Sequence, residues 1–324
     1  MMFEFNNGVH LKGTAIWFDA IKKKKMSFIT NALATAYLNH EKVIATPQTC
    51  RLLKSRIKKA NMLPCPYNHV FNLGKTEVEF IPSGYIPGSC QVLLYKGNKK
   101  ILYVSDFKLD LLAMATPIEI TQCDYLVIKS TFGVRKYIFQ NAEVAIIPII
   151  EFINNCIQND QVPVLLTDRI GISQEIIRLV AERGFDLFVH DSIHRINIIY
   201  QELGYQMPGY SRLTNSTGSV RGVIIVPREY KKDNILLSQQ NAVHAAISEI
   251  AINDSGFDTT DSGTDYSFPF SIRSGFDEML KYVELVKPSE VYVTGNFNTE
   301  FSGELGKKGY KSYVLNNPEQ LNLI

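Results

Sequence analysis

Residues 142–226 alternate helix-type and strand-type segments, and this alternation constrains the fold more than any other feature of the sequence. Apolar residues recur at helical spacing in three segments, and short runs rich in Val, Ile and Leu lie between and after them. Strands joined in this way by helices usually pair in parallel, so the alternation predicts a parallel, doubly wound domain. In chain order the segments are 142–159, 162–166, 173–183, 186–189, 192–203 and 223–226.

The flanking parts of the chain contain more strands. The half before residue 135 is dominated by short apolar runs, and the end of the chain adds a helix and a strand. A chain of 324 residues is long enough for two domains. We therefore expect an α/β protein with a sheet-rich part and a separate parallel domain. The clearest flanking segments are 77–81, 90–95, 101–105, 125–128, 276–286 and 290–293.

One loop has the sequence of a turn that presents a side chain. Residues 81–91 read IPSGYIPGSCQ, and the glycines at 84 and 88 permit tight turns on both sides of Tyr85. A strand, a turn and a second strand then lead to Asp106. This layout often delivers metal ligands to a pocket, yet the presented side chain is a tyrosine. The loop therefore suggests either a hydrolase or a relative that has lost the activity.

Positive charge is concentrated in one segment. Residues 22–59 carry a net charge of +9, whereas the whole chain carries +2 and the remainder −7. Such asymmetry predicts an anionic partner, with nucleic acid as the first candidate. The alternative is that these residues form two solvated faces, a lysine loop and an exposed helix. The candidate nucleic-acid-binding residues are Lys22, Lys23, Lys24, Lys25, Arg51, Lys54, Arg56, Lys58 and Lys59.

The cysteines and the apolar runs indicate an intracellular protein. The five cysteines are widely spaced and form no CxxC pair or Cys/His cluster, which favours reduced, buried thiols over disulfides or a zinc ribbon. No apolar run approaches the roughly 18 residues of a membrane span, and the N-terminus lacks a signal-peptide pattern. We expect a cytoplasmic protein with no membrane partner.

Several motifs, in order along nearly the whole chain, resemble those of the metallo-β-lactamase-fold nucleases with a β-CASP insertion. The similarity is greatest to the prokaryotic branch of mRNA 3′-end processing factors and DNA ligase-associated exonucleases. IATPQT resembles the "ATPET" segment, IPSGYIPGSCQ the "PAGHVLGSAQ" segment and VSDF the "SGDY" segment. IKSTFG resembles "TESTFG", and GISQE resembles "GKAQR". These motifs lie at 44–49, 81–91, 104–107, 128–133 and 171–175.

The resemblance implies a four-layer αβ/βα sandwich with an inserted Rossmann-like domain. The metallo-β-lactamase-like domain would comprise residues 1–135 and 270–324, and the β-CASP-like domain residues 136–269. Members of this family cleave RNA or DNA with two zinc ions. A zinc ion acts by lowering the pKa of its bound water and by polarising the phosphoryl group.

The zinc ligands that the resemblance implies are largely missing from this sequence. Zinc is bound by imidazole, carboxylate or thiolate groups, and only Asp106 supplies one at a matching position. We therefore expect no metal cofactor and no hydrolysis by the family mechanism. The HxHxDH motif, a later histidine and a C-terminal histidine match positions whose ligands are lost, namely Asn31, Leu33, Thr35, Ala36, Tyr85 and Gly295.

Two basic residues take the place of other family groups. Lys129 stands where "TESTFG" has its acid, and Arg273 stands where a β-CASP histidine is expected. With Tyr85 and Asp106 they would form a vestigial pocket. One reading is that the two cations form a metal-free phosphate cradle, with Arg273 making bidentate contacts. The other is that Asp106 only needs partners for its burial. Tyr85 would fill the vacated pocket or stack on a base.

These observations predict a catalytically silent β-CASP nuclease homologue. It would bind RNA or single-stranded DNA, or act as the non-catalytic partner of an active nuclease, ligase or helicase in RNA processing or DNA repair; a homodimer is a further alternative. Two other readings stay open. One is an active metal-dependent exonuclease or hydrolase with a divergent site, and the other is a scaffold that binds only proteins.

Overall fold

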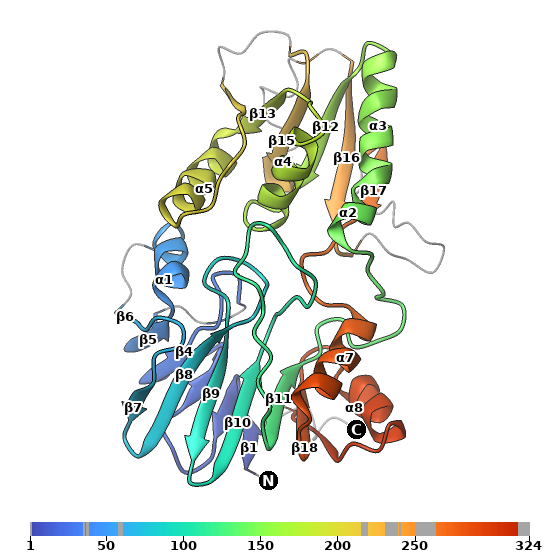
Figure 1. Cartoon of the computed structure of the whole chain (residues 1–324). Coiled ribbons are helices and arrows are strands. Elements are labelled where there is room, and N and C mark those ends of the chain that lie inside the picture. The colour runs from blue at the N-terminus through green and yellow to red at the C-terminus, as the bar shows by residue number, and fades with distance from the viewer. Residues whose placement is uncertain are drawn as a thin grey trace. The chain divides into compact units, whose positions relative to one another are not determined.

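The chain divides into two compact units in the computed structural model (Figure 1). The structure describes residues 2–34, 36, 39–57, 61–214, 220–230, 239, 241–250 and 264–316. Unit 1 comprises Met1–Leu111, Ala115–Ile138 and Arg273–Ile324, and unit 2 comprises Leu112–Met114 and Phe139–Ile272. That unit 1 is a metallo-β-lactamase-like domain and unit 2 a β-CASP-like domain stays a prediction.

Unit 1 contains two sheets. The six-stranded sheet has the spatial order β1 (Phe3–Phe5), β2 (Val9–Leu11), β3 (Trp17–Phe18), β4 (Met26–Phe28), β5 (Lys42–Ala45) and β6 (Met62–Pro64). The seven-stranded sheet has the order β19 (Ser312–Val314), β18 (Glu290–Thr294), β11 (Tyr125–Lys129), β10 (Lys99–Val104), β9 (Cys90–Lys96), β8 (Thr76–Pro82) and β7 (Phe71–Leu73).

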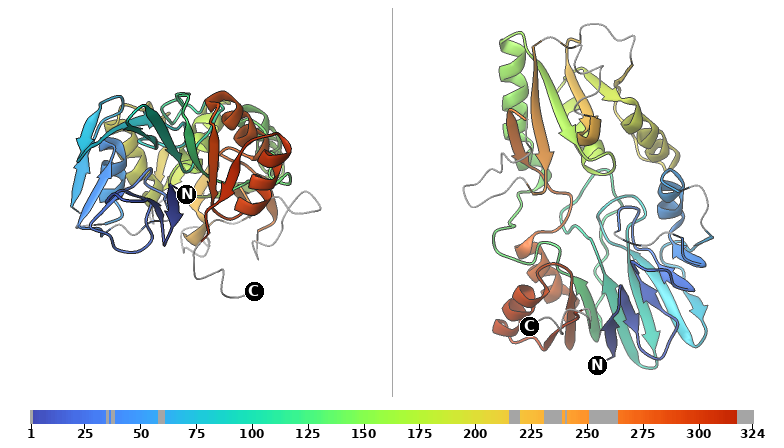
Figure 2. Two further views of the ribbon diagram at one scale, coloured as in Figure 1. Left: turned by 90° about the horizontal axis from the view of Figure 1, so that it is seen from below. Right: turned by 180° about the vertical axis from the view of Figure 1, so that it is seen from behind.

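The seven-stranded sheet is buried on both faces. Alternate residues of its strands point to opposite sides, so each strand contributes to two cores. One core is shared with the six-stranded sheet, where the rings of Phe28 and Phe80 lie 5.6 Å apart. The other is shared with α7 (Phe276–Val286) and α8 (Asn298–Lys307). The ribbons of these two helices, coloured orange to red, lie beside β18 in Figure 2. A third helix of unit 1, α1 (Pro47–Lys54), connects β5 to β6.

Unit 2 is built on one six-stranded parallel sheet. The spatial order is β14 (Ser211–Leu213), β13 (Leu187–His190), β15 (Val223–Pro227), β12 (Val162–Thr167), β16 (Ala242–Ser248) and β17 (Tyr266–Pro269). Its helices are α2 (Ala142–Ala145), α3 (Ile147–Gln158), α4 (Ile172–Ala181), α5 (Asp191–Glu202) and the 3₁₀ turn η1 (Arg228–Tyr230).

The α/β class and the parallel sheet of unit 2 are confirmed, but one helix prediction was wrong and some strands were not predicted. The helix expected over 142–159 is divided into α2 and α3 at Ile146, because Pro148 has no N–H to donate to the preceding turn. Strands β14, β16 and β17 extend the sheet beyond the segments that the sequence predicted. The two sheets and the helices of unit 1 do not by themselves establish a four-layer sandwich, which stays a prediction.

The cysteine prediction is confirmed. All five cysteines are buried and unpaired. Burial raises the pKa of the Cys50 thiol to about 11 and that of the Cys123 thiol to about 12. These thiols are therefore protonated at neutral pH and poorly suited to be nucleophiles or zinc ligands.

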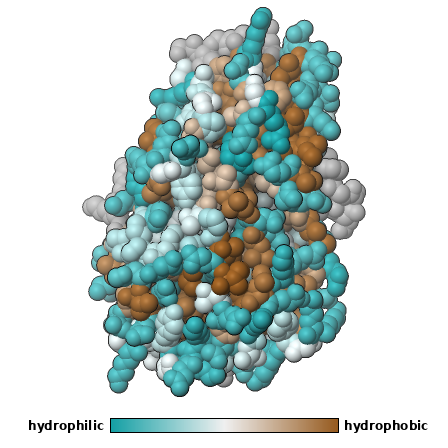
Figure 3. All heavy atoms as spheres, in the orientation of Figure 1, coloured by the Kyte–Doolittle hydropathy of each residue, from teal (hydrophilic) through white to brown (hydrophobic). Residues whose placement is uncertain are grey.

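Apolar residues on the molecular surface form separate patches among hydrophilic ones on the face shown in Figure 3. Within the described part of the chain, no helix is both long and apolar enough to cross a bilayer. A cytoplasmic location stays a prediction.

Candidate functional site

One edge of the seven-stranded sheet collects the polar residues of the predicted pocket. Strands β10, β11 and β18 are parallel neighbours, so their carboxyl ends meet at the same edge. Asp106 follows β10, Lys129 is the last residue of β11, and Gly295 follows β18. All three belong to unit 1, as do Arg273 and Tyr85.

Asp106 lies at the centre of this edge and is engaged through both carboxylate oxygens. Its side chain is 4% exposed. The Nζ of Lys129 lies 3.1 Å from Oδ2, while the hydroxyl of Thr131 and the Nη1 of Arg273 lie 3.1 and 3.3 Å from Oδ1. The structure therefore brings together the acid and the two cations that the sequence singled out.

The electrostatics keep Asp106 ionised. Burial alone would raise the pKa of this carboxyl. The charges of Lys129 and Arg273, with hydrogen bonds from Lys129 and Thr131, outweigh burial and hold the pKa well below its usual range. Two cations thus neutralise the buried negative charge of Asp106. Hydrogen-bond donors occupy the positions at its oxygens where a metal ion would bind.

Arg273 is positioned by the loop that follows β10. The backbone N–H of Ser274 donates to the carbonyl of Phe107 at 2.7 Å, and the Oγ of Ser274 accepts from the N–H of Leu109 at 3.1 Å. In the same loop, the fully buried Lys108 donates to Glu278 of α7 at 2.7 Å. These contacts fix the segment before α7 beside Asp106.

A second carboxylate, Asp19, was missed by the sequence analysis. It follows β3 and accepts hydrogen bonds from the N–H and hydroxyl of Thr30 at 2.9 and 2.7 Å and from the hydroxyl of Tyr103 at 3.1 Å. Burial raises its pKa, and the Thr30 hydrogen bonds and the charge of Lys129 oppose that rise. One signal was available, because Asp19 is the only acidic residue between positions 5 and 40.

The loop containing Tyr85 is fixed by two glycines with positive φ, Gly84 at 81° and Gly88 at 84°. The carbonyl of Gly88 accepts hydrogen bonds from the hydroxyls of Thr46 and Thr49, at 2.7 and 2.8 Å, at the start of α1. A Cβ at position 88 would lie 2.3 Å from the backbone nitrogen of Thr49. This close approach leaves room only for glycine.

Tyr85 itself is buried in unit 1. Its side chain belongs to the core and the residue is 5% exposed. The guanidinium carbon of Arg273 lies 5.9 Å from the centre of its ring and 4.8 Å from that of Phe132. In this conformation the ring supports Arg273, and stacking on a base would require the ring to move.

The other positions matched to zinc ligands do not fit a two-zinc site. Asn31 is fully buried, and its Oδ1 accepts from the N–H of Leu33 at 2.9 Å. Leu33, Ala36 and Gly295 have no ligand atom in their side chains, and Thr35 lies outside the described residues. Among the residues described, no three His, Cys, Asp or Glu side chains cluster to hold a metal ion.

The predicted nucleic-acid-binding residues lie in two elements. Lys22, Lys23 and Lys25 are exposed in the loop before β4, and Lys24 places its Nζ 3.4 Å from the centre of the Trp17 ring. Burial and the charge of Lys22 lower the pKa of Lys24. The helix α1 and the turn after it carry the others that the structure describes, Arg51, Lys54 and Arg56. Lys58 and Lys59 lie outside the described residues.

Arg56 does not extend freely from its turn, because its Nη1 donates to the carbonyl of Ala32. Arg51 is half-buried, whereas Lys54 is exposed. The lysine loop is therefore more accessible than the helix as a surface for an anionic partner. That any of these residues binds nucleic acid stays a prediction.

Comparison with known proteins gives one informative similarity. No protein-family model matches the chain. A protein of Opitutus terrae named "Probable DNA ligase" is 27% identical over 329 residues, which cover 99% of this chain and 32% of that protein. The chain thus spans about a third of the length of the curated relative that it matches.

Proposed function

We propose that this chain is a non-catalytic nucleic-acid-binding module of a DNA-processing system. The proposal includes a four-layer metallo-β-lactamase sandwich over residues 1–135 and 270–324 and a β-CASP-like domain over 136–269. Its nuclease site would be silent. The similarity of nearly the whole chain to a protein named "Probable DNA ligase" supports the DNA-processing role. A ligase activity on a separate chain or region is the partner that fits this similarity best.

The contacts of Asp106 carry the proposal. Lys129 and Arg273 supply two positive charges within hydrogen-bonding distance of one carboxylate, where the resemblance would place a zinc ion. A zinc ion at this position would have to displace these donors. Metal-activated attack by water therefore has no support from the residues that the structure describes.

The same cluster can bind a phosphate. Asp106 supplies one negative charge against the two positive charges of Lys129 and Arg273. The side chains of Lys129 and Arg273 are 26% and 23% exposed, so solvent can reach them. Because both reach the same carboxylate, a single phosphate beside them can contact both. Asp19 offsets part of this positive charge, and its carboxylate is held by Thr30 and Tyr103. We infer a metal-free phosphate cradle.

Fluorescence anisotropy with labelled single-stranded DNA, single-stranded RNA and nicked duplex, titrated with salt, tests the proposal. We expect an affinity that falls as salt rises, because bound phosphates release counterions. Asp106→Asn should bind more tightly, since it removes the carboxylate that competes with phosphate. Adding Lys129→Ala and Arg273→Ala to that variant should weaken binding about tenfold relative to wild type.

The triple variant is used because Lys129→Ala/Arg273→Ala alone would leave a buried carboxylate unpaired. A second variant, with Lys22, Lys23, Lys24 and Lys25 neutralised, should flatten the salt dependence if the lysine loop contacts phosphates. Equal affinities in all variants would remove the cradle from the proposal. No binding at low salt would leave the scaffold that binds only proteins as the better reading.

A further inference from the structure

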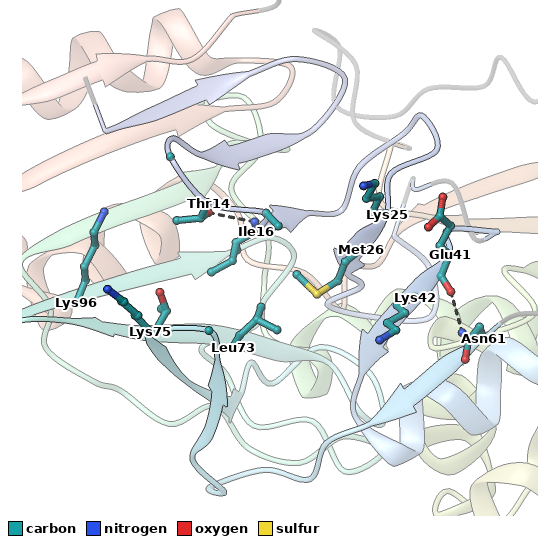
Figure 4. A pocket seen from close by; sticks show the side chains of 14 residues that line it. Thr14, Ile16, Lys25, Met26, Glu41, Lys42, Asn61, Leu73, Lys75 and Lys96 are labelled. Atoms are coloured by element: carbon teal, nitrogen blue, oxygen red, sulfur yellow. Dashed lines mark hydrogen bonds between the residues drawn. The ribbon is translucent and has the colours of Figure 1, made fainter.

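A second candidate site lies at the opposite ends of the strands of unit 1. A pocket of about 960 Å³ opens where β4, β5 and β8 begin and β9 ends (Figure 4). Because β9 and β10 are antiparallel, this edge is opposite to the one that holds Asp106. The lining residues are Gly13, Thr14, Ala15, Ile16, Lys25, Met26, Glu41, Lys42, Asn61, Leu73, Gly74, Lys75, Thr76 and Lys96.

The pocket is strongly positive. Lys25, Lys42, Lys75 and Lys96 are exposed and line it together with one acid, Glu41. Among the described residues, none of these four ammonium groups has a hydrogen-bond or ion-pair partner. Four like charges around one pocket repel each other, and an anionic ligand would relieve that repulsion.

Other lysines of unit 1 show that carboxylate partners are common in this fold. Six of them lie within 3.1 Å of a carboxylate oxygen, in contrast to the four pocket lysines, although other exposed lysines in the described part of the chain, such as Lys22, Lys54 and Lys281, also have no such partner. The paired residues are Lys99 with Asp124, Lys108 with Glu278, Lys129 with Asp106, Lys307 with Glu304, Lys308 with Glu284 and Lys311 with Glu290.

The charges stand at the two ends of an apolar floor. Figure 4 shows Lys75 and Lys96 at one end and Lys25 and Lys42 at the other. Between them lie Ile16, Met26 and Leu73, which pack against the core shared by the two sheets. The floor is therefore the open end of that core, and an apolar group placed there would extend it.

We propose that this pocket binds an acidic peptide segment of a protein partner, with an apolar side chain on the floor and carboxylates at both ends. The volume is at the upper end of the range of roughly 300–1,000 Å³ for ligand sites, which leaves room for several residues. Methionine and aliphatic side chains adapt to varied apolar groups. The site goes beyond the proposed nucleic-acid-binding edge and does not depend on it.

The lining favours a peptide over a nucleic acid. None of the lining residues is aromatic, so the pocket offers no ring on which a base could stack. None is an arginine, so it lacks the fork that recognises a phosphate in a bidentate manner. Lysine ammonium groups flanking an aliphatic floor match an acidic segment with a central apolar residue.

Methyl NMR of the full chain labelled at methionine and isoleucine methyl groups tests this proposal. The probe is the peptide Glu-Asp-Ile-Leu-Asp-Glu, and the control peptide is Gln-Asn-Ile-Leu-Asn-Gln. We expect the acidic peptide to shift the Met26 methyl signal, assigned with Met26→Leu, and the neutral one to leave it in place. A charge-reversed variant, Lys75→Glu/Lys96→Glu, should bind the acidic peptide about tenfold more weakly.

The matched control is Lys281→Glu/Lys287→Glu, which changes net charge equally at exposed positions outside the pocket. It should bind the peptide as wild type does. No shift of the Met26 signal at about 1 mM peptide, a range that includes weak complexes, would overturn the proposal. A Met26 shift with single-stranded DNA and not with the peptide would also overturn it and would assign the pocket to nucleic acid. Neither result bears on the Asp106 edge, whose variants are different; the lysine-loop variant shares Lys25 with the pocket and is therefore not used in this test.

Discussion

At the scale of single residues, the main feature is the neutralisation of buried Asp106 by two cations. Its partners lie 23 and 167 residues further along the chain, at Lys129 and Arg273. The sequence and the resemblance already grouped these three residues in one pocket. Their contact distances and the role of Thr131 were not, because hydrogen-bond geometry depends on how β10, β11 and the segment before α7 pack.

Asp106→Asn should lower the free energy of unfolding at pH 7 by about 1–3 kcal/mol, because it leaves two neighbouring cations without a counter-charge. The folded state lowers the pKa of Asp106 below its ordinary value of 3.8. The stabilisation is therefore fully present above that value and is lost as pH falls towards the folded-state pKa. Urea unfolding at pH 7 and at successively lower pH measures both effects.

In this experiment the difference between wild type and Asp106→Asn should shrink as the pH falls below about 4, because the Asp106 carboxyl then begins to protonate in the unfolded chain while it stays ionised in the folded one. Asn31→Asp is not a suitable control, since it adds a buried charge. Thr131→Val is better, because it removes one hydrogen bond to Asp106 and leaves the charges in place. A difference that stays constant down to pH 2.5 would contradict the ion-pair account.

At the scale of elements, the loop between β8 and β9 shows what local sequence can determine. The glycines on both sides of Tyr85 predicted tight turns, and both have positive φ in the structure. Nothing in the local sequence indicated that Gly88 lies against the N-terminus of α1, where Thr46 caps the helix by accepting from the N–H of Thr49. That contact joins residues about forty positions apart.

Gly88→Ala should lower the free energy of unfolding by about 2–4 kcal/mol, through the strained φ and the overlap of the new Cβ with Thr49. The matched control is Gly97→Ala in the turn between β9 and β10. Its φ is also positive, at 59°, but nothing lies within 4 Å of the added Cβ. We expect the control to cost only about 1 kcal/mol. Equal losses in thermal or urea unfolding would mean that the contact with α1 adds nothing.

At the scale of the whole molecule, the open alternative is an active hydrolase with a divergent metal site. If the Asp106 edge is silent, dialysis against Zn²⁺ followed by elemental analysis should find less than one tightly bound zinc ion per chain. Nuclease assays with Zn²⁺ or Mn²⁺ should give the same rate for wild type and Asp106→Ala, because no described residues form a zinc-binding cluster with Asp106. Nearly two zinc ions per chain, with activity lost in Asp106→Ala, would reject the silent module.

The sequence by itself determined the features that depend on local periodicity and residue type. The alternation of helices and apolar strands indicated the parallel sheet of unit 2, and the wide spacing of the cysteines, with no CxxC pair, indicated buried thiols. The absence of the zinc ligands that the resemblance implies was evident from the residue types at the matching positions. Such features can be read locally because a strand or helix pattern repeats within a few residues.

Only the tertiary structure decided which distant residues meet. Asp19 joins Tyr103 across 84 positions, and the pocket collects Lys25, Lys42, Lys75 and Lys96 from strand ends of two sheets. The candidate nucleic-acid-binding residues that the structure describes are divided between a loop and the helix α1 with its following turn, whereas three of the four pocket lysines, Lys42, Lys75 and Lys96, lie outside that set. The physical reason is that strand order and the packing of the two sheets place side chains together, and neither is encoded in any short stretch of the chain.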